Sequence, residues 1–201
     1  MKYSLALAIL AVLVLSTSAN ANITSVDCYN DGDGAIIMNY WDSDLSDSAN
    51  GIVSMDEALH WYPAHALVDV TTDELDPTLR ITKEVDNDTT YAWSGYLINV
   101  VRNGYFTIPS ATEPIGWNPP AITTPTLQVS GIYAGLYEGS VSYAAGAGTP
   151  VAIGNTGVFK LTTSFSGSST FTLEQIPIPE PSTLALLLLG GLGGLAIFKR
   201  R

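Results

Sequence analysis

The chain has 201 residues, of which 46% are hydrophobic and 13% are charged, and its formal net charge is −11 at pH 7. Residues 22–180 are more acidic, because they hold all 19 acidic residues against four cationic ones, a net charge of −15. Nucleic-acid phosphates and anionic lipid headgroups attract basic surfaces, so we expect no nucleic-acid partner, whereas divalent cations and neutral glycans remain compatible. The single cysteine, Cys28, excludes an internal disulfide, and we expect it to be buried or else paired between chains.

The first 21 residues have the pattern of a secretory signal peptide. Lys2 provides the positive start, Leu5–Leu15 is the apolar stretch, and Ala19 and Ala21 are the small residues that precede a cleavage site. We therefore predict an N-terminal signal helix, export through the Sec machinery and cleavage after Ala21. An uncleaved N-terminal anchor is the alternative.

Residues 22–176 consist of short runs of β-branched and aromatic residues separated by Gly, Pro, Asn and Asp, which is typical of strands and turns. In one run, Leu79, Ile81 and Val85 share one face and polar residues the other. Asn103-Gly104 indicates a two-residue hairpin turn, and Asp56–Trp61 is expected to form at most one helical turn. The predicted strands are Ala35–Trp41, Gly51–Met55, Ala66–Thr71, Thr78–Val85, Tyr91–Val101, Tyr105–Ile108, Leu127–Glu138, Ser140–Ala144, Val151–Ile153, Gly157–Phe165 and Thr170–Ile176.

These strands predict an all-β fold, an antiparallel β-sandwich or jelly-roll-like single domain over residues 22–176. The Pro-rich segment Asn118–Pro125 is interpreted as a long loop inside this domain, and a division into two domains is the alternative. Ile176–Pro179 is predicted to be an extended linker that leads to the C-terminal segment.

The C-terminal segment has three parts in order: Pro179-Glu180-Pro181, the uncharged apolar run Leu184–Phe198, and a basic terminus at residues 199–201. As a helix the run reaches ~22 Å, against ~30 Å of bilayer hydrocarbon, so it is short for a permanent span. We predict a C-terminal apolar helix, a transmembrane segment over residues 183–198, with the basic tail in the cytoplasm. Cleavage beside the tripeptide is expected, and an uncut anchor or a buried core helix are the alternatives.

This order of tripeptide, apolar stretch and basic terminus resembles the C-terminal sorting signal of bacterial PEP-CTERM proteins. The resemblance implies that an exosortase, a transpeptidase-like membrane protease, recognises Pro179, Glu180 and Pro181, and that residues 177–201 form the sorting signal. It implies a membrane-anchored precursor that is then sorted to the cell surface or extracellular matrix, and an association with exopolysaccharide and biofilm formation. The middle region also resembles the β-rich extracellular part of PEP-CTERM proteins of unknown function, over Leu75–Leu79, Asn87–Thr90 and Tyr91–Tyr96.

Clustered aspartates offer a calcium site, because Ca²⁺ prefers several oxygen ligands at close range. An EF-hand loop is excluded, since its first and twelfth positions fall on Tyr29 and Tyr40. The alternative is that the aspartates form turns through their own side chains, and then no cofactor is needed. The candidate calcium ligands are Asp31, Asp33, Asp42 and Asp44, with Asp47, Asp86 and Asp88 as further choices.

The two histidines, His60 and His65, are expected to be structural or solvent-facing. A transition-metal site with Glu57 and Asp69 is the alternative, although the paired-histidine pattern of zinc proteases is absent. No Gly-x-Ser-x-Gly motif occurs, and nothing near Cys28 indicates a thiol hydrolase. We therefore predict that the protein is not an enzyme.

Aromatic side chains can stack on sugars, but they also fill sandwich cores. Trp117, which lies between Gly116 and Asn118-Pro119, is expected to be the most exposed tryptophan and is the candidate ligand-binding residue. The sequence thus predicts a non-enzymatic exported cell-surface or extracellular-matrix protein. A carbohydrate-binding or adhesive module, calcium-dependent or not, is the alternative, and ice binding is disfavoured because a regular Thr-x-Thr ladder is missing.

Overall fold

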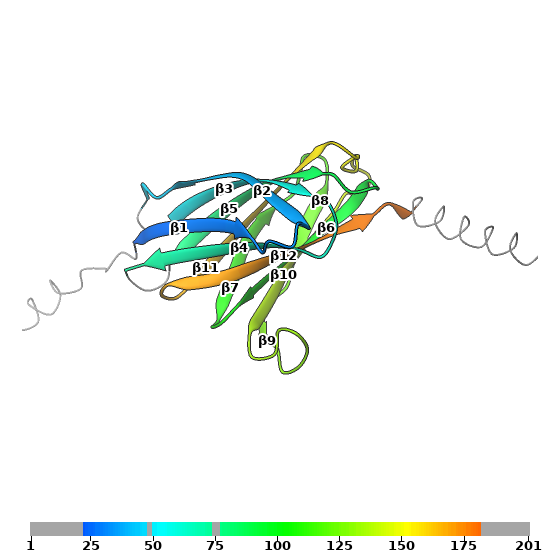
Figure 1. Cartoon of the computed structure of the whole chain (residues 1–201). Coiled ribbons are helices and arrows are strands. Elements are labelled where there is room, and N and C mark those ends of the chain that lie inside the picture. Colours follow the sequence, from blue (N-terminus) through cyan, green and yellow to red (C-terminus); the bar gives the residue numbers. More distant parts are fainter. Residues whose placement is uncertain (1–21, 48–49, 74–76, 182–201) are drawn as a thin grey trace, which may run out of the picture.

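The computed structural model describes residues 22–47, 50–73 and 77–181, which form two β-sheets packed into a sandwich (Figure 1). The predicted all-β sandwich is confirmed. Within these ranges no helix is long and apolar enough to cross a bilayer. The predicted signal helix with Ala19 and Ala21, the membrane segment 183–198, the basic tail 199–201 and the Leu75-Asp76 dipeptide lie outside the described residues.

The larger sheet has seven strands in the spatial order β1-β4-β12-β6-β10-β8, with the short β9 paired to β10. Its strands are β1 (Ile23–Asn30), β4 (Ala64–Thr72), β12 (Ser169–Pro179), β6 (Trp93–Arg102), β10 (Tyr137–Ala144), β8 (Asn118–Ile122) and β9 (Thr126–Leu127). The smaller sheet has five strands in the order β2-β3-β5-β11-β7. These are β2 (Ile36–Asp44), β3 (Asn50–Leu59), β5 (Thr78–Asn87), β11 (Thr156–Phe165) and β7 (Phe106–Thr112).

One strand pair departs from the predicted antiparallel arrangement. Between β3 and β5 the chain runs through β4 in the other sheet, and β5 then returns beside β3 in the same direction. The two strands are parallel from Asn50↔Thr78 to Leu59↔Asn87. The prediction is wrong here because a period-two pattern shows which face a side chain occupies, but not the direction of the neighbouring strand.

The core lies between the sheets, where alternate residues of strands such as β5 and β11 point inward. The rings of Tyr96 on β6 and Phe159 on β11 are stacked, with centroids 4.1 Å apart, and so join the two sheets. Tyr143 and Trp117 contact Phe159 edge-on. Each aromatic side chain removes about 150–250 Å² from water, so this cluster stabilises the contact between the sheets.

Several predicted segments differ in the structure. The predicted strand Leu127–Glu138 is mostly a loop, in which Gly131 and Gly135 have left-handed backbone, at φ 86° and 87°. β3 continues through Asp56–Leu59, so the expected helical turn there is wrong. The predicted Pro-rich loop contains the edge strand β8, and β1 was not among the predicted strands because its buried and exposed residues do not alternate regularly.

Five loops, β1–β2, β3–β4, β5–β6, β7–β8 and β10–β11, meet with the end of β12 at one end of the sandwich, which we call the C-terminal end (Figure 1). The β1–β2 and β3–β4 loops are joined by His60 N, which donates to Ala35 O at 2.9 Å. The end of β5 and the β10–β11 loop are joined by Asn87 N, which donates to Asn155 O at 2.9 Å. β12 also ends here, whereas Asn22 lies at the opposite end of the sandwich.

Candidate functional site

The β1–β2 loop is built from side chains that accept hydrogen bonds from nearby backbone. Asn30 Oδ1 accepts from Gly32 N at 3.0 Å, Asp31 Oδ1 from Asp33 N at 3.1 Å, and Asp33 Oδ1 from Ala35 N at 2.6 Å. Gly32, at φ 85°, supplies the left-handed backbone that such a tight turn requires. The sequence Asn30-Asp31-Gly32-Asp33 therefore folds locally into successive Asx turns.

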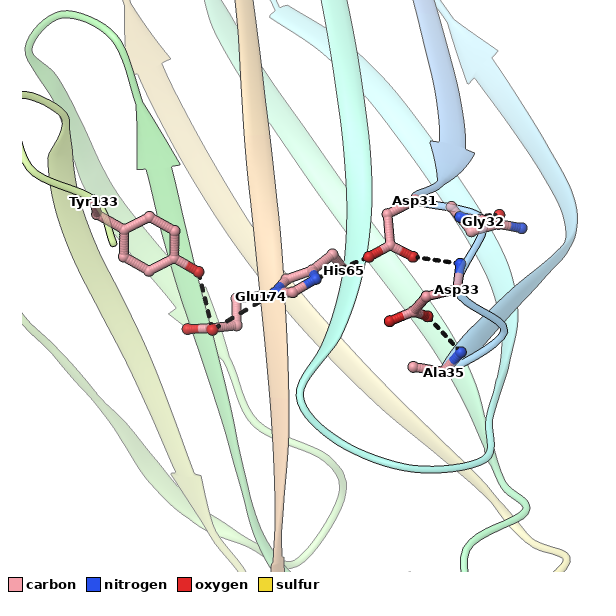
Figure 2. A network of polar contacts seen from close by, with 8 residues as sticks. Asp31, Gly32, Asp33, Ala35, His65, Tyr133 and Glu174 are labelled. Atoms are coloured by element: carbon pink, nitrogen blue, oxygen red, sulfur yellow. Dashed lines mark hydrogen bonds and ion pairs between the residues drawn. The ribbon is translucent and has the colours of Figure 1, made fainter. Parts of the chain in front are cut away.

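A row of polar side chains runs from this loop across the outer face of the larger sheet, and we call it the His65 row (Figure 2). His65 on β4 lies with Nδ1 3.0 Å from Asp31 Oδ2 and Nε2 3.6 Å from Glu174 Oε1 on β12. Tyr133 from the β9–β10 loop donates its hydroxyl to Glu174 Oε1 at 2.9 Å. Asn99 on β6 donates to Glu174 Oε2 at 2.6 Å.

Electrostatics in this row are dominated by its two carboxylates. Partial burial acts to raise the pKa of Asp31, but hydrogen bonds from His65 and Asp33 outweigh it, and that pKa lies below its ordinary value. Burial first, and then the hydrogen bond to Glu174, raise the pKa of the Tyr133 hydroxyl. Tyr133 is therefore a neutral donor at physiological pH, and the row ties two loops to the face of the sheet.

The predicted metal ligands are not brought together. Asp31 and Asp33 precede β2, whereas Asp42 and Asp44 lie at its other end, and a nine-residue strand spans roughly 26 Å. Asp42 Oδ1 accepts from Ser43 N at 2.8 Å and Asp44 Oδ1 from Ser46 N at 2.9 Å, so each pair serves its own turn. In the described part of the chain, no three His, Cys, Asp or Glu side chains are grouped so as to hold a metal ion.

The alternative histidine site also fails to assemble. Glu57 points into the core, where its Oε1 accepts from Lys83 Nζ at 2.7 Å. His60 instead lies 3.9 Å from Asp88 Oδ2 at the C-terminal end. Glu57 and His60 therefore do not share a site, since Glu57 lies on the inward face of β3 and His60 follows the end of that strand.

Trp117 is not the exposed tryptophan. Only 7% of it is exposed, its indole donates to Thr149 O at 2.9 Å, and its ring contacts Phe159 in the core. The expected exposure is wrong because a tryptophan beside Gly and Pro can fold back from a turn and cover the sheet. Its edge lines a groove of about 500 Å³ together with Pro114, Ile115 and Val151.

The exposed aromatic side chains at the C-terminal end are Trp61 and Tyr62, which are 52% and 49% exposed. Both lie in the β3–β4 loop. The Trp61 ring packs over Gly34 of the β1–β2 loop, and the Tyr62 ring meets Tyr91 edge-on, with centroids 6.3 Å apart. The adjacent aromatics Trp61 and Tyr62, followed by Pro63, are the feature of the sequence that could have indicated this surface.

The tripeptide that begins at Pro179 is attached to the sheet. β12 continues through Pro179, so Ile176–Pro179 is a paired strand rather than the predicted linker. Ser94 Oγ donates to Pro179 O at 3.0 Å, and Glu180 N donates to Ala92 O at 3.2 Å. Beyond Gln175 the strand pairs with β6 alone, and such an edge tolerates prolines that cannot donate to a ladder.

Comparison with known proteins gives one family match. Residues 177–201 match the PEP-CTERM protein-sorting motif, as the resemblance implied. The matched segment begins inside β12 and includes Pro179, Glu180 and Pro181. Searches of curated proteins and of solved structures returned no match. The chain thus carries the sorting motif of exosortase-sorted exported proteins, whose precursors are anchored in the membrane.

Proposed function

We propose that this protein is a non-enzymatic exported protein, sorted by an exosortase, whose β-sandwich is displayed at the cell surface or in the extracellular matrix. The sandwich is the displayed part, and the segment after Pro181 serves only to sort it. The chemistry of the exosortase then determines whether the sandwich is attached to the surface or released into the matrix.

One observation carries this proposal: the sorting motif overlaps the last strand of the sandwich, with no domain or linker between the two. β12 ends at Pro179, inside the matched motif. Cleavage at the motif would leave all twelve strands in the product. The domain that is sorted is therefore the domain that folds, and the product of cleavage is the intact sandwich.

The polar contacts of the His65 row support a non-enzymatic role. Both oxygens of Glu174 and both oxygens of Asp31 already have neighbouring donors or a histidine nitrogen. A general base needs a nucleophile within about 3 Å. The hydroxyl of Tyr133, which belongs to this row, already donates a hydrogen bond to Glu174 Oε1. The row fits a role in fixing loops.

The sorting part is tested by replacing Pro179, Glu180 and Pro181 together with alanine in the native host. We expect the variant to remain in the inner-membrane fraction, whereas the parent protein reaches the surface or medium. The matched control is Ile153→Ala, an exposed residue 59% accessible at the same end of the sandwich, which should be sorted like the parent. Unchanged sorting of the triple variant would overturn the proposal.

A second candidate function, carbohydrate binding, is favoured by the exposed pair Trp61 and Tyr62. Flat aromatic rings beside carboxylates form the usual surface for a neutral sugar, since the rings cover its apolar face and the carboxylates accept from its hydroxyls. Asp31 and Asp88 belong to the two loops that flank this pair. We infer that a glycan, if bound, stacks here rather than on Trp117.

A glycan array with the chain from Asn22 to Glu180, with and without chelator, tests this second function. Trp61→Ala should abolish binding, and Tyr105→Ala should not, because Tyr105 is similarly exposed, at 54%, in the β6–β7 loop at the opposite end. Binding that survives Trp61→Ala would place the ligand elsewhere, and no binding in either condition would remove the function.

A further inference from the structure

The orientation of the domain relative to the membrane is set by how the sorting segment leaves the sheet. Pro179 is the last residue of β12 and is held by Ser94, and Glu180 is held by Ala92. Both partners belong to the start of β6 or to the loop before it. The chain therefore leaves from a fixed point on the C-terminal end of the sandwich.

Little chain separates this fixed point from the apolar run. Only Pro181, Ser182 and Thr183 lie between Glu180 and Leu184. An extended chain covers at most ~3.6 Å per residue, so Glu180 lies within about 14 Å of the first apolar residue. Headgroups occupy roughly 5–8 Å on each side of the hydrocarbon. While the apolar run is in the membrane, the C-terminal end of the sandwich must lie at the headgroup surface.

The side chains exposed on this end suit that position. Trp61 and Tyr62 project from the β3–β4 loop, Ile153 from the β10–β11 loop, and Ile178 from β12. Trp and Tyr prefer the membrane–water interface, where an apolar ring and a polar group are both accommodated. Tyr62 contacts Tyr91, whose neighbour Ala92 holds Glu180, so the aromatic pair lies close to the point where the chain leaves.

We propose that in the uncut precursor the sandwich stands end-on to the membrane, with Trp61 and Tyr62 against the lipid headgroups. The inference rests on the proposed anchoring of the precursor. Cutting at the motif then frees the same aromatic surface. The apolar run tethers the domain, and Trp61 and Tyr62 pack at the interface. Electrostatic attraction does not contribute, because the acidic residues at this end, among them Asp31, Asp33 and Asp88, do not attract anionic lipids.

The test places a fluorophore at each end of the domain. The full chain is expressed in an exporting host without an exosortase and reconstituted into phosphatidylcholine vesicles that contain a nitroxide-labelled lipid. Trp61→Cys is labelled with an environment-sensitive dye, and Tyr105→Cys is the matched control at the opposite end, roughly 30 Å away along the ten-residue β6. Cys28 is buried and stays unlabelled in the folded protein.

We expect at least threefold stronger nitroxide quenching at position 61 than at position 105. Tyr62→Cys provides a second probe of the same surface, should the Trp61 variant fold poorly. Vesicle flotation separates the possible failures. Flotation with equal quenching at both ends would overturn the end-on orientation alone, whereas protein that does not float with vesicles would overturn the anchoring and this inference with it.

Discussion

Lys83 and Glu57 form an ion pair inside the sandwich, with Nζ 2.7 Å from Oε1 and both side chains fully buried. The two residues come from β5 and β3, which are the parallel strand pair of the described sheets, and Lys83 also contacts Met55 Sδ at 3.7 Å. A buried charge without its partner is far less stable than the pair. Each of the two charges is therefore stable in the core only beside the other, and the ion pair links β3 to β5.

The first prediction concerns this pair. Lys83→Met should lower the free energy of unfolding by about 3–5 kcal/mol, because it leaves Glu57 charged and unpaired in the core. The double variant Lys83→Met/Glu57→Met should recover most of the loss, since two apolar side chains of similar volume replace the pair. Urea unfolding at pH 7 measures both values.

Arg80→Met is the matched control, because Arg80 is exposed on the opposite face of the same strand. It should change stability by less than about 0.5 kcal/mol. If Lys83→Met were equally mild, the ion pair would not contribute as the geometry indicates.

The second prediction concerns pH. The pKa of Asp31 is lowered on folding, so its stabilising contribution is complete above the ordinary aspartate pKa of about 3.9 and is lost as pH falls through the lowered value. Asp31→Asn keeps the turn acceptor but removes the charge, and at pH 7 it should cost under about 1 kcal/mol. The difference from the parent should shrink in urea titrations from pH 5 to pH 2.

Removing the partner gives the check on this pH effect. In a His65→Gln background the Asp31→Asn substitution should cost less, because the contact between Asp31 Oδ2 and His65 Nδ1 is gone. A cost that is the same at all pH values and in both backgrounds would show that the turn alone, and not the contact with His65, sets the effect.

The third prediction concerns Cys28. Burial raises the pKa of its thiol to about 12, only partly opposed by the positive charge of Lys83. The thiolate is the reactive form, so a thiol reagent at pH 8 should modify the folded protein at least a hundredfold more slowly than the protein in urea. Rapid modification without denaturant, or a disulfide-linked dimer of the folded protein, would favour pairing between chains instead.

The fourth prediction concerns Arg102, which closes the end of the sandwich opposite the sorting motif. Its guanidinium donates to Tyr105 O at 2.8 Å, to Ser166 O at 3.0 Å and to Ser169 Oγ, and it lies 5.0 Å from the centroid of Phe165. Lysine cannot reproduce these divergent bonds. Arg102→Lys should cost about 2 kcal/mol in thermal unfolding, with Arg80→Lys near neutral, and an equal effect of both would contradict this role.

The sandwich could be predicted from the sequence because strands with alternating faces, such as Leu79–Val85, are local signals. The two-residue hairpin predicted at Asn103-Gly104 is wrong, because β6 and β7 on either side of it lie in different sheets and do not pair. The parallel pairing of β3 with β5 could not be predicted, since it depends on where β4 lies in space. The continuation of β12 through Pro177 and Pro179 was also missed. Prolines usually end a strand, because they cannot donate a hydrogen bond to a neighbouring strand. Beyond Gln175, β12 has no β4 partner on one side, so prolines are acceptable there.

For the candidate site, the sorting motif was visible because it is a contiguous pattern at one end of the chain. The His65 row was not, because Asp31, His65 and Glu174 come from three strands or loops far apart in sequence. Trp61, and not Trp117, is the exposed tryptophan, since exposure depends on which ring finds space between the sheets. The calcium site remains a prediction, with Asp31 and Asp33 separated from Asp42 and Asp44 by the length of β2.

The most direct measurement is the intact mass of the protein from its native host, in cell envelope, matrix and medium. We expect a species that begins at Asn22 and ends between Pro179 and Pro181, outside the inner membrane. A species that keeps Leu184–Arg201 and stays in the inner membrane would instead make this chain a tethered β-domain that is not sorted.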